Sequence, residues 1–122
     1  KMAAILDNPQ DFNTIWIADI NNHRAGSIAV TQKPDNTAFI NFLLVKPEFR
    51  GRGLARHLLN TVITHTRNHH LKVLRLETYN CLTAARSLYA KTGFKLYKTN
   101  PSVKKFSRTL DQEFWETVLT SG

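Results

Sequence analysis

Cysteine, long apolar runs and acidic residues are all scarce in this sequence of 122 residues. The single cysteine, Cys81, excludes an internal disulfide framework and fits a reducing compartment. No apolar run approaches the roughly 20 residues that a membrane-spanning helix requires, and the first residues lack the apolar core of a signal peptide. We therefore predict a cytoplasmic protein that does not associate with a membrane.

Acidic residues are too few to balance the basic ones. Asp and Glu number 9 against 17 Lys and Arg, which gives a formal net charge of +8 and a pI near 10. This surplus predicts a negatively charged partner, such as a phosphate group, a nucleic acid or an acidic protein. Internal repeats and linker-like stretches are also lacking, so residues 1–122 are predicted to form one domain.

The apolar pattern alternates between strand and helix periods along the chain. Three β-favouring runs separated by turn residues predict an antiparallel meander, and the third run is apolar enough to be central. Two segments of helical period follow, and each leads into another strand. The order βββαβαββ predicts a mixed α+β domain, with a basic loop around Pro101 between the last two strands. The predicted strands are 15–20, 27–30, 38–45, 73–78, 94–98 and 114–119, and the predicted helices are 53–69 and 83–91.

A glycine-rich turn between the third strand and the first helix carries the strongest local signal, Arg50-Gly51-Arg52-Gly53. Glycines let backbone N–H groups approach a ligand, and a helix N-terminus adds unpaired donors and a positive dipole. The turn is not a P-loop, because no Gly-Lys-Ser or Gly-Lys-Thr follows. It predicts a phosphate site, and a solvated turn with two arginines is the open alternative.

Two motifs in this order identify a family resemblance. Arg50-x-x-Gly53-x-Ala55 resembles the acetyl-CoA signature of the GNAT superfamily of N-acetyltransferases, and Ala85-x-x-Leu88-Tyr89-x-x-x-Gly93-Phe94 resembles its later motif. The resemblance covers residues 15–94 and implies a GNAT-like fold with a largely antiparallel central sheet flanked by helices. A narrower resemblance links residues 82–116 to the acetyltransferase half of bacterial MarR-type regulator fusions.

The resemblance implies acetyl-CoA as co-substrate and no metal. Backbone N–H groups of the glycine-rich turn would hold the coenzyme A pyrophosphate, with its two arginines near the phosphates. The pantetheine arm would pair with the edge of the central strand like an additional strand. The implied cofactor-binding residues are Leu43, Leu44, Val45, Arg50, Gly51, Arg52, Gly53, Leu54 and Ala55.

The implied reaction is direct attack of a primary amine on the thioester, which requires one proton acceptor and one proton donor. Tyr89 matches the family's acid for the departing thiolate, and its alternative role is that of a core tyrosine. Glu77 is the candidate base, and its alternative role is a surface carboxylate paired with Arg75 or a lysine. The acceptor, a small molecule or a protein, is not specified by the sequence.

Two features depart from the family pattern. Leu82 stands where many members have an Asn that binds the pantetheine arm, and Asn80 is either a substitute for it or a plain turn residue. The first strand and helices of the full fold also have no evident counterpart, and residues 2–6 are interpreted as the tail of a helix. The chain is therefore either a part of a longer protein or a domain completed in a homodimer.

Two further sequence features give weaker evidence of function than these motifs. His65 and His69 have the spacing of zinc ligands but lack a third ligand, and a dipole-complementing role explains histidines at this helix end more simply. The basic stretch 86–108 lacks a nucleic-acid-binding motif, so nucleic acid is an unlikely partner and a solvated face the default. A non-catalytic acyl-CoA-binding or regulatory module remains the main alternative to the enzyme.

Overall fold

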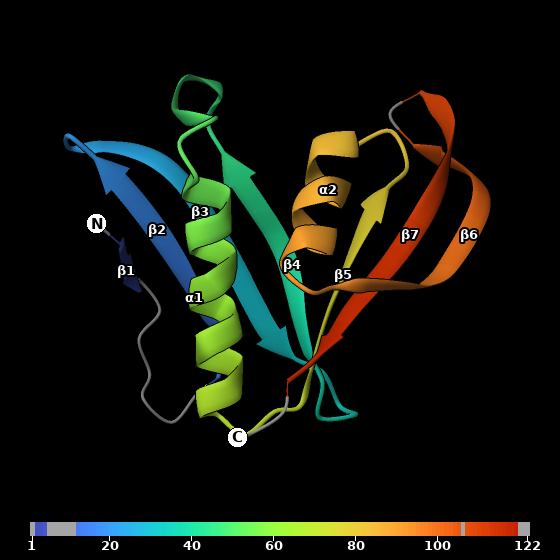
Figure 1. Ribbon diagram of the computed structural model, residues 1–122, viewed down its shortest axis with the longest axis horizontal. Coiled ribbons are helices and arrows are strands. Elements are labelled where there is room, and N and C mark those ends of the chain that lie inside the picture. Colours follow the sequence, from blue (N-terminus) through green and yellow to red (C-terminus); the bar gives the residue numbers. More distant parts are fainter. Residues whose placement is uncertain (1, 5–11, 106, 120–122) are drawn as a thin grey trace.

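In the computed structural model, which describes residues 2–4, 12–105 and 107–119, seven strands form one sheet and two α-helices lie over one of its faces (Figure 1). The strand order is β1-β2-β3-β4-β5-β7-β6, and β4–β5 is the parallel pair among antiparallel ones. The predicted mixed α+β fold is confirmed. The elements are β1 (Met2–Ala4), β2 (Thr14–Ile20), β3 (His23–Gln32), β4 (Ala38–Val45), the 3₁₀ turn η1 (Pro47–Phe49), α1 (Leu54–Asn68), β5 (Val73–Tyr79), α2 (Thr83–Lys91), β6 (Lys95–Lys105) and β7 (Arg108–Val118).

The last two strands form a much longer hairpin than the sequence pattern predicts. The segment around Pro101, predicted as a loop, belongs to β6, and pairing with β7 continues to Lys105↔Arg108. Proline is tolerated because β6 is an edge strand and its register shifts between Asn100 and Val103. Most β6 side chains are exposed, and beyond residue 98 the alternating apolar signal that would mark a strand is absent.

The N-terminal segment also differs from the prediction. Residues 2–4 form β1 and pair antiparallel with β2, from Met2↔Ala18 to Ala4↔Trp16, so they are not the tail of a helix. Residues 5 and 6 of the same predicted tail lie outside the described residues. As a strand, these residues pair with the backbone groups at the edge of β2, which would otherwise be an edge strand.

The core lies between the helices and the sheet. Leu58, Leu59 and Val62 of α1 are fully buried at the helical spacing that predicted this face. Leu74 and Leu76 of β5 meet them from the sheet, and the core continues under α2. Alternation along β5 therefore directs residues 75 and 77 to the opposite face. No helix in the described part of the chain is long and apolar enough to cross a membrane.

β4 and β5 pair over a very short distance. Their ladder consists of Ala38↔Leu74 and Phe39↔Arg75, at the beginning of both strands. Beyond these pairs the two strands diverge, as Figure 1 shows. A shift in register between Ala29 and Val30 of β3 accompanies this divergence on the β4 side. The sheet thus opens between β4 and β5 toward the ends at which η1 and α2 begin.

His65 of α1 holds the start of β2 through a partly buried contact. Its Nε2 lies 2.8 Å from the Phe12 carbonyl oxygen, so this nitrogen donates a proton. The ring centroid lies 4.8 Å from that of Phe12, 4.8 Å from that of Trp16 and 4.3 Å from that of His69. Burial lowers the pKa of His65, and the hydrogen bond to Phe12 only partly opposes this effect.

This lowered pKa predicts a loss of stability in mild acid. The unfolded chain, with an ordinary His pKa of about 6.5, binds more protons than the folded one once pH falls below that value. Stability is therefore present above the unfolded pKa and is lost as pH falls through the folded pKa. Thermal melts between pH 7.5 and 5.5 should show a smaller acid-induced decrease in Tm for His65→Gln than for wild type. The matched variant His23→Gln, at an exposed position, should keep the wild-type slope.

Candidate active site

The turn between β4 and α1 presents unpaired backbone N–H groups. Gly51 and Gly53 have φ angles of +79° and +77°, a region that favours glycine. The first hydrogen bond of α1 runs from the His57 N–H to the Gly53 carbonyl oxygen over 3.0 Å. The N–H groups of residues 54–56 therefore lack acceptors within the helix and lie at the positive end of its dipole. Such a helix N-terminus can bind an anion.

A cavity of about 410 Å³ lies between this turn, the first residues of α1 and one side of α2. Half of its walls are residues predicted from the sequence to bind the cofactor, namely Val45, Arg50, Gly51, Gly53, Leu54 and Ala55. The other half consists of Phe49, Arg56, Ala84, Ser87, Leu88 and Lys91.

The cavity combines apolar walls with positive charge. Arg50 and Arg56 contribute guanidinium groups from the turn and α1, and Lys91 contributes an ammonium group from the end of α2. No Asp or Glu belongs to the cavity walls formed by the described residues. Charge of one sign beside an unpaired helix N-terminus suits a ligand with several negative charges and an apolar part.

Three of the predicted cofactor residues lie outside the cavity walls. Leu43 packs against the core, whereas Leu44 is 60% exposed. The guanidinium carbon of Arg52 lies 5.5 Å from the centre of the Phe49 ring. Arg50 instead turns toward the strand, where its Nε donates to the Val45 carbonyl oxygen at 3.2 Å. That carbonyl belongs to the strand edge that the pantetheine arm was predicted to use.

Tyr89 lies on the inner face of α2 and is 8% exposed. Its ring centroid is 5.9 Å from that of Phe94, and its hydroxyl forms no hydrogen bond with the described residues. Burial raises the pKa of the phenol, so it stays protonated at neutral pH. Tyr89 is next to Leu88, which lines the cavity, but Tyr89 itself does not line it.

Glu77 lies on the other face of the sheet. Its neighbours Leu76 and Thr78 are buried toward the helices, so its own exposed side chain points away from them. The carboxylate accepts a hydrogen bond from the Gln112 side-chain amide of β7. The Arg75 partner considered from the sequence is engaged elsewhere, because Arg75 Nε donates to Glu116 at 2.9 Å.

Asn80 and Leu82 occupy the loop between β5 and α2. The Asn80 side chain accepts from the Asp111 N–H at 3.0 Å, and its own N–H donates to the Asp111 carbonyl oxygen at 3.0 Å. Asn80 thus connects this loop to β7, as a structural turn residue does. Leu82 is 43% exposed and offers no hydrogen-bonding side chain where family members carry Asn.

The described residues contain no group of three or more His, Cys, Asp or Glu side chains that could hold a metal ion. The Nδ1 atom of His69 lies 2.9 Å from the His65 carbonyl oxygen, and His65 is bonded to Phe12 as described above. Both imidazoles therefore use a ring nitrogen for backbone contacts.

The wall formed by α2 was missed by the sequence analysis. Its cavity residues, Ala84, Ser87, Leu88 and Lys91, follow the spacing i, i+3, i+4, i+7 and so share one side of the helix. The same spacing is visible in the sequence once Tyr89 is assigned to the buried side. A lysine at the end of such a stripe is the signal that could have identified the second wall.

The chain is similar in sequence to known acetyltransferases. The model of the Acetyltransferase (GNAT) family matches residues 2–94. A streptothricin acetyltransferase from Escherichia coli is 30% identical in an alignment of 104 residues that covers 80% of this chain and 60% of that protein. This chain therefore spans less than two thirds of the curated relative.

Solved structures share the fold. A putative streptothricin acetyltransferase from Bacillus anthracis in complex with acetyl coenzyme A has a TM-score of 0.81 at 24% identity, covering 88% of this chain and 63% of that one. The ribosomal-protein-S18-alanine N-acetyltransferase of Escherichia coli has a TM-score of 0.82 at 19% identity, covering 90% and 71%. The match to the family model covers most of the sequence and shows that the chain belongs to the GNAT family of acetyltransferases.

Proposed function

We propose that this chain is an acetyl-CoA-dependent N-acetyltransferase that transfers an acetyl group to a primary amine by direct attack. The observation that carries the proposal is the positively charged cavity where the helix N-terminus of α1 faces α2. Coenzyme A has the matching chemistry, since it joins several phosphate charges to a long, largely apolar arm. The acceptor is an amine-bearing small molecule or protein, because the relatives named above include both a streptothricin and a ribosomal-protein acetyltransferase.

The coenzyme would lie along the divergence of β4 and β5. Its pyrophosphate would accept from the N–H groups that follow Gly53, with Arg50 and Arg56 beside it. Its arm would extend along residues 43–45 of β4, whose edge is not paired with β5. Because Arg50 covers the Val45 carbonyl, we expect its guanidinium to move toward the phosphates when the coenzyme binds.

The two proton tasks would be performed on opposite faces of the sheet. The amine nitrogen attacks the thioester carbonyl carbon, the C–S bond breaks, and the sulfur leaves as a thiolate. Tyr89, on the helix face, would donate its phenolic proton to that sulfur, and Glu77, on the other face, would accept the amine proton directly or through a water. The opening between β4 and β5 is the passage that would let both groups reach the reacting atoms.

A non-catalytic acyl-CoA-binding or regulatory module is the second candidate. Two observations favour it: Leu82 replaces a hydrogen-bonding Asn, and Asn80 is engaged with Asp111. The resemblance of residues 82–116 to MarR-type regulator fusions points the same way. Such a module would bind the coenzyme in the same cavity and would transfer no acetyl group.

Calorimetry with coenzyme A, followed by an acetylation screen, separates the two candidates. The proposal expects saturable binding with one coenzyme per chain, and consumption of acetyl-CoA in the presence of at least one amine. Binding without transfer to any amine in a broad screen would support the regulatory module. No binding at high protein concentration would contradict both.

Lys91→Glu should weaken coenzyme A binding by about tenfold or more, because charged hydrogen bonds in a binding site contribute about 1.5–3 kcal/mol. Calorimetry at low and high salt measures the effect, which should shrink as salt screens the charges. Lys72→Glu is the matched control, since this exposed lysine precedes β5 at the other end of the sheet. Equal losses in both variants would mean that net charge, and not the cavity, determines the affinity.

A further inference from the structure

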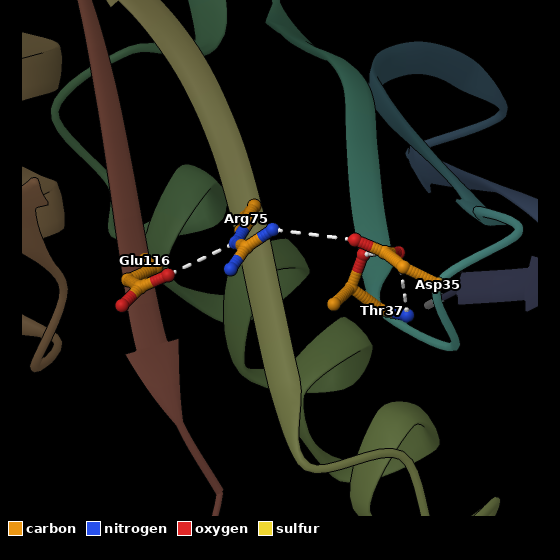
Figure 2. A network of polar contacts seen from close by, with 4 residues as sticks. All are labelled: Asp35, Thr37, Arg75 and Glu116. Atoms are coloured by element: carbon orange, nitrogen blue, oxygen red, sulfur yellow. Dashed lines mark hydrogen bonds and ion pairs between the residues drawn. The ribbon is translucent and has the colours of Figure 1, made fainter. Parts of the chain in front are cut away.

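The closed end of the opening between β4 and β5 carries a network of charged side chains on the sheet face away from the helices. Figure 2 shows Arg75 of β5 between Glu116 of β7 and Asp35 of the turn before β4. Arg75 Nε donates to Glu116 Oε1 at 2.9 Å, and Arg75 Nη1 donates to Asp35 Oδ2 at 3.5 Å. One guanidinium therefore connects the half of the sheet formed by β1–β4 to the half formed by β5–β7.

The two ends of this connection are held in place before they meet. Thr37 donates to Asp35 Oδ1 twice, from its hydroxyl at 2.5 Å and from its N–H at 3.2 Å. These hydrogen bonds, with the Thr37 hydroxyl first, keep the pKa of Asp35 below its ordinary value, so its carboxylate stays charged. Arg75 is fixed within its own half of the sheet by Glu116, directly opposite in the ladder, and by the Tyr97 ring, 5.2 Å from its guanidinium carbon.

The turn that carries Asp35 is itself rigid. The Lys33 N–H donates to the Thr37 carbonyl oxygen at 2.8 Å, and the Asn36 N–H donates to the Lys33 carbonyl oxygen at 3.0 Å. An exposed ion pair usually adds little because ordering two long side chains costs entropy. The other contacts of Arg75 and Asp35 already order both side chains. Forming this ion pair therefore costs little further entropy, even though the pair is solvent-accessible.

The backbone alone holds the two halves weakly at this point. The β4–β5 ladder has the two pairs Ala38↔Leu74 and Phe39↔Arg75, and the Arg75–Asp35 contact adds a side-chain link between the halves beside them. Any rotation of one half about these two pairs would change the distance between β4 and β5 farther along. A side-chain contact across the closed end of the opening limits that rotation.

We propose that Arg75 is a positioning residue that connects the two halves of the sheet at the closed end of the opening between β4 and β5 and so sets the width of this opening. The expected effect of Arg75 on coenzyme binding rests on the proposed function, whereas its effect on the width of the opening does not. Asp35 is the cross-half partner, and Glu116 orients Arg75 within its own half.

The width is measured without cofactor by spin-label distances. Labels at Lys46→Cys, after β4, and at Thr109→Cys, on β7, both exposed, are placed in a Cys81→Ser chain. We expect Arg75→Gln and Asp35→Ala to broaden the distance distribution between the labels. Arg67→Gln, which removes one exposed positive charge from α1, should leave it unchanged. An unchanged distribution in Arg75→Gln would overturn the proposal, whatever the chain binds.

Coenzyme A affinity measures the consequence in the unlabelled chain. We expect the Kd to rise about fivefold in Arg75→Gln and about threefold in Asp35→Ala, the size expected from losing one exposed but ordered link. It should stay near wild type in Arg67→Gln and in Glu116→Gln, whose amide oxygen still accepts from Arg75. Broadened distances with an unchanged Kd would overturn the positioning role. If the wild-type chain binds no coenzyme A, the proposed function is wrong. The spin-label distances still test whether Arg75 sets the width of the opening.

Discussion

Tyr89→Phe should lower kcat for acetyl transfer by about 100-fold, the lower end of the effect of a positioned general acid. The departing thiolate needs a proton, and the phenol is held protonated by burial, with a raised pKa and a hydroxyl that forms no hydrogen bond with the described residues. Removing the hydroxyl leaves the ring and its packing against Phe94 in place. Steady-state kinetics with saturating acetyl-CoA measure the change.

The control separates catalysis from packing. Tyr97→Phe removes a hydroxyl from an exposed tyrosine of β6 and should leave kcat within twofold of wild type, about the noise of such a measurement. Coenzyme A affinity and Tm of Tyr89→Phe should also match wild type. If affinity and kcat fell together, Tyr89 would be a core residue of α2, which is the alternative that its amphipathic helix allows.

Much of the fold can be predicted from the local pattern of apolar residues, because the helices and strands that form the core bury one face. The α1 stripe of Leu58, Leu59 and Val62 is buried as its spacing predicts, and the apolar run of β4 lies in the middle of the sheet. Only the outer half of the β6–β7 hairpin escaped prediction, because it buries almost nothing. There, pairing is determined by the partner strand and not by an apolar face.

The candidate site is predictable to the extent that its residues are adjacent in sequence. The Gly51 and Gly53 turn is a local motif, and both glycines have positive φ angles at the start of α1. The second wall comes from α2, about 30 residues later, and it reaches the turn only because both helices cover the same face of the sheet. The contacts of Arg75 could not be predicted for the same reason, since its partners Asp35 and Glu116 are 40 and 41 residues away in the sequence.

Arg86→Met should lower the free energy of unfolding by about 2–3 kcal/mol, or Tm by roughly 10 °C for a domain of this size. Arg86 of α2 donates from Nε to the carboxylate of Glu113 at 2.8 Å, and Glu113 is 4% exposed on β7. Without Arg86, the Trp115 indole N–H, at 3.2 Å, is the side-chain donor that remains to this buried charge. The estimate is below that for a fully buried pair because Arg86 is itself 36% exposed.

Urea unfolding of the double variant Arg86→Met/Glu113→Gln tests the cause. A neutral amide oxygen still accepts from Trp115 and leaves no unpaired charge, so the double variant should recover more than half of the lost stability. Arg108→Met, at an exposed position of the same hairpin, should change stability by less than about 0.5 kcal/mol. If the double variant were no more stable than Arg86→Met, the loss would come from the packing of α2. Because α2 also carries Lys91 of the cavity wall and Tyr89, the proposed acid, the stability of this ion pair bears on the α2 side of the proposed coenzyme site.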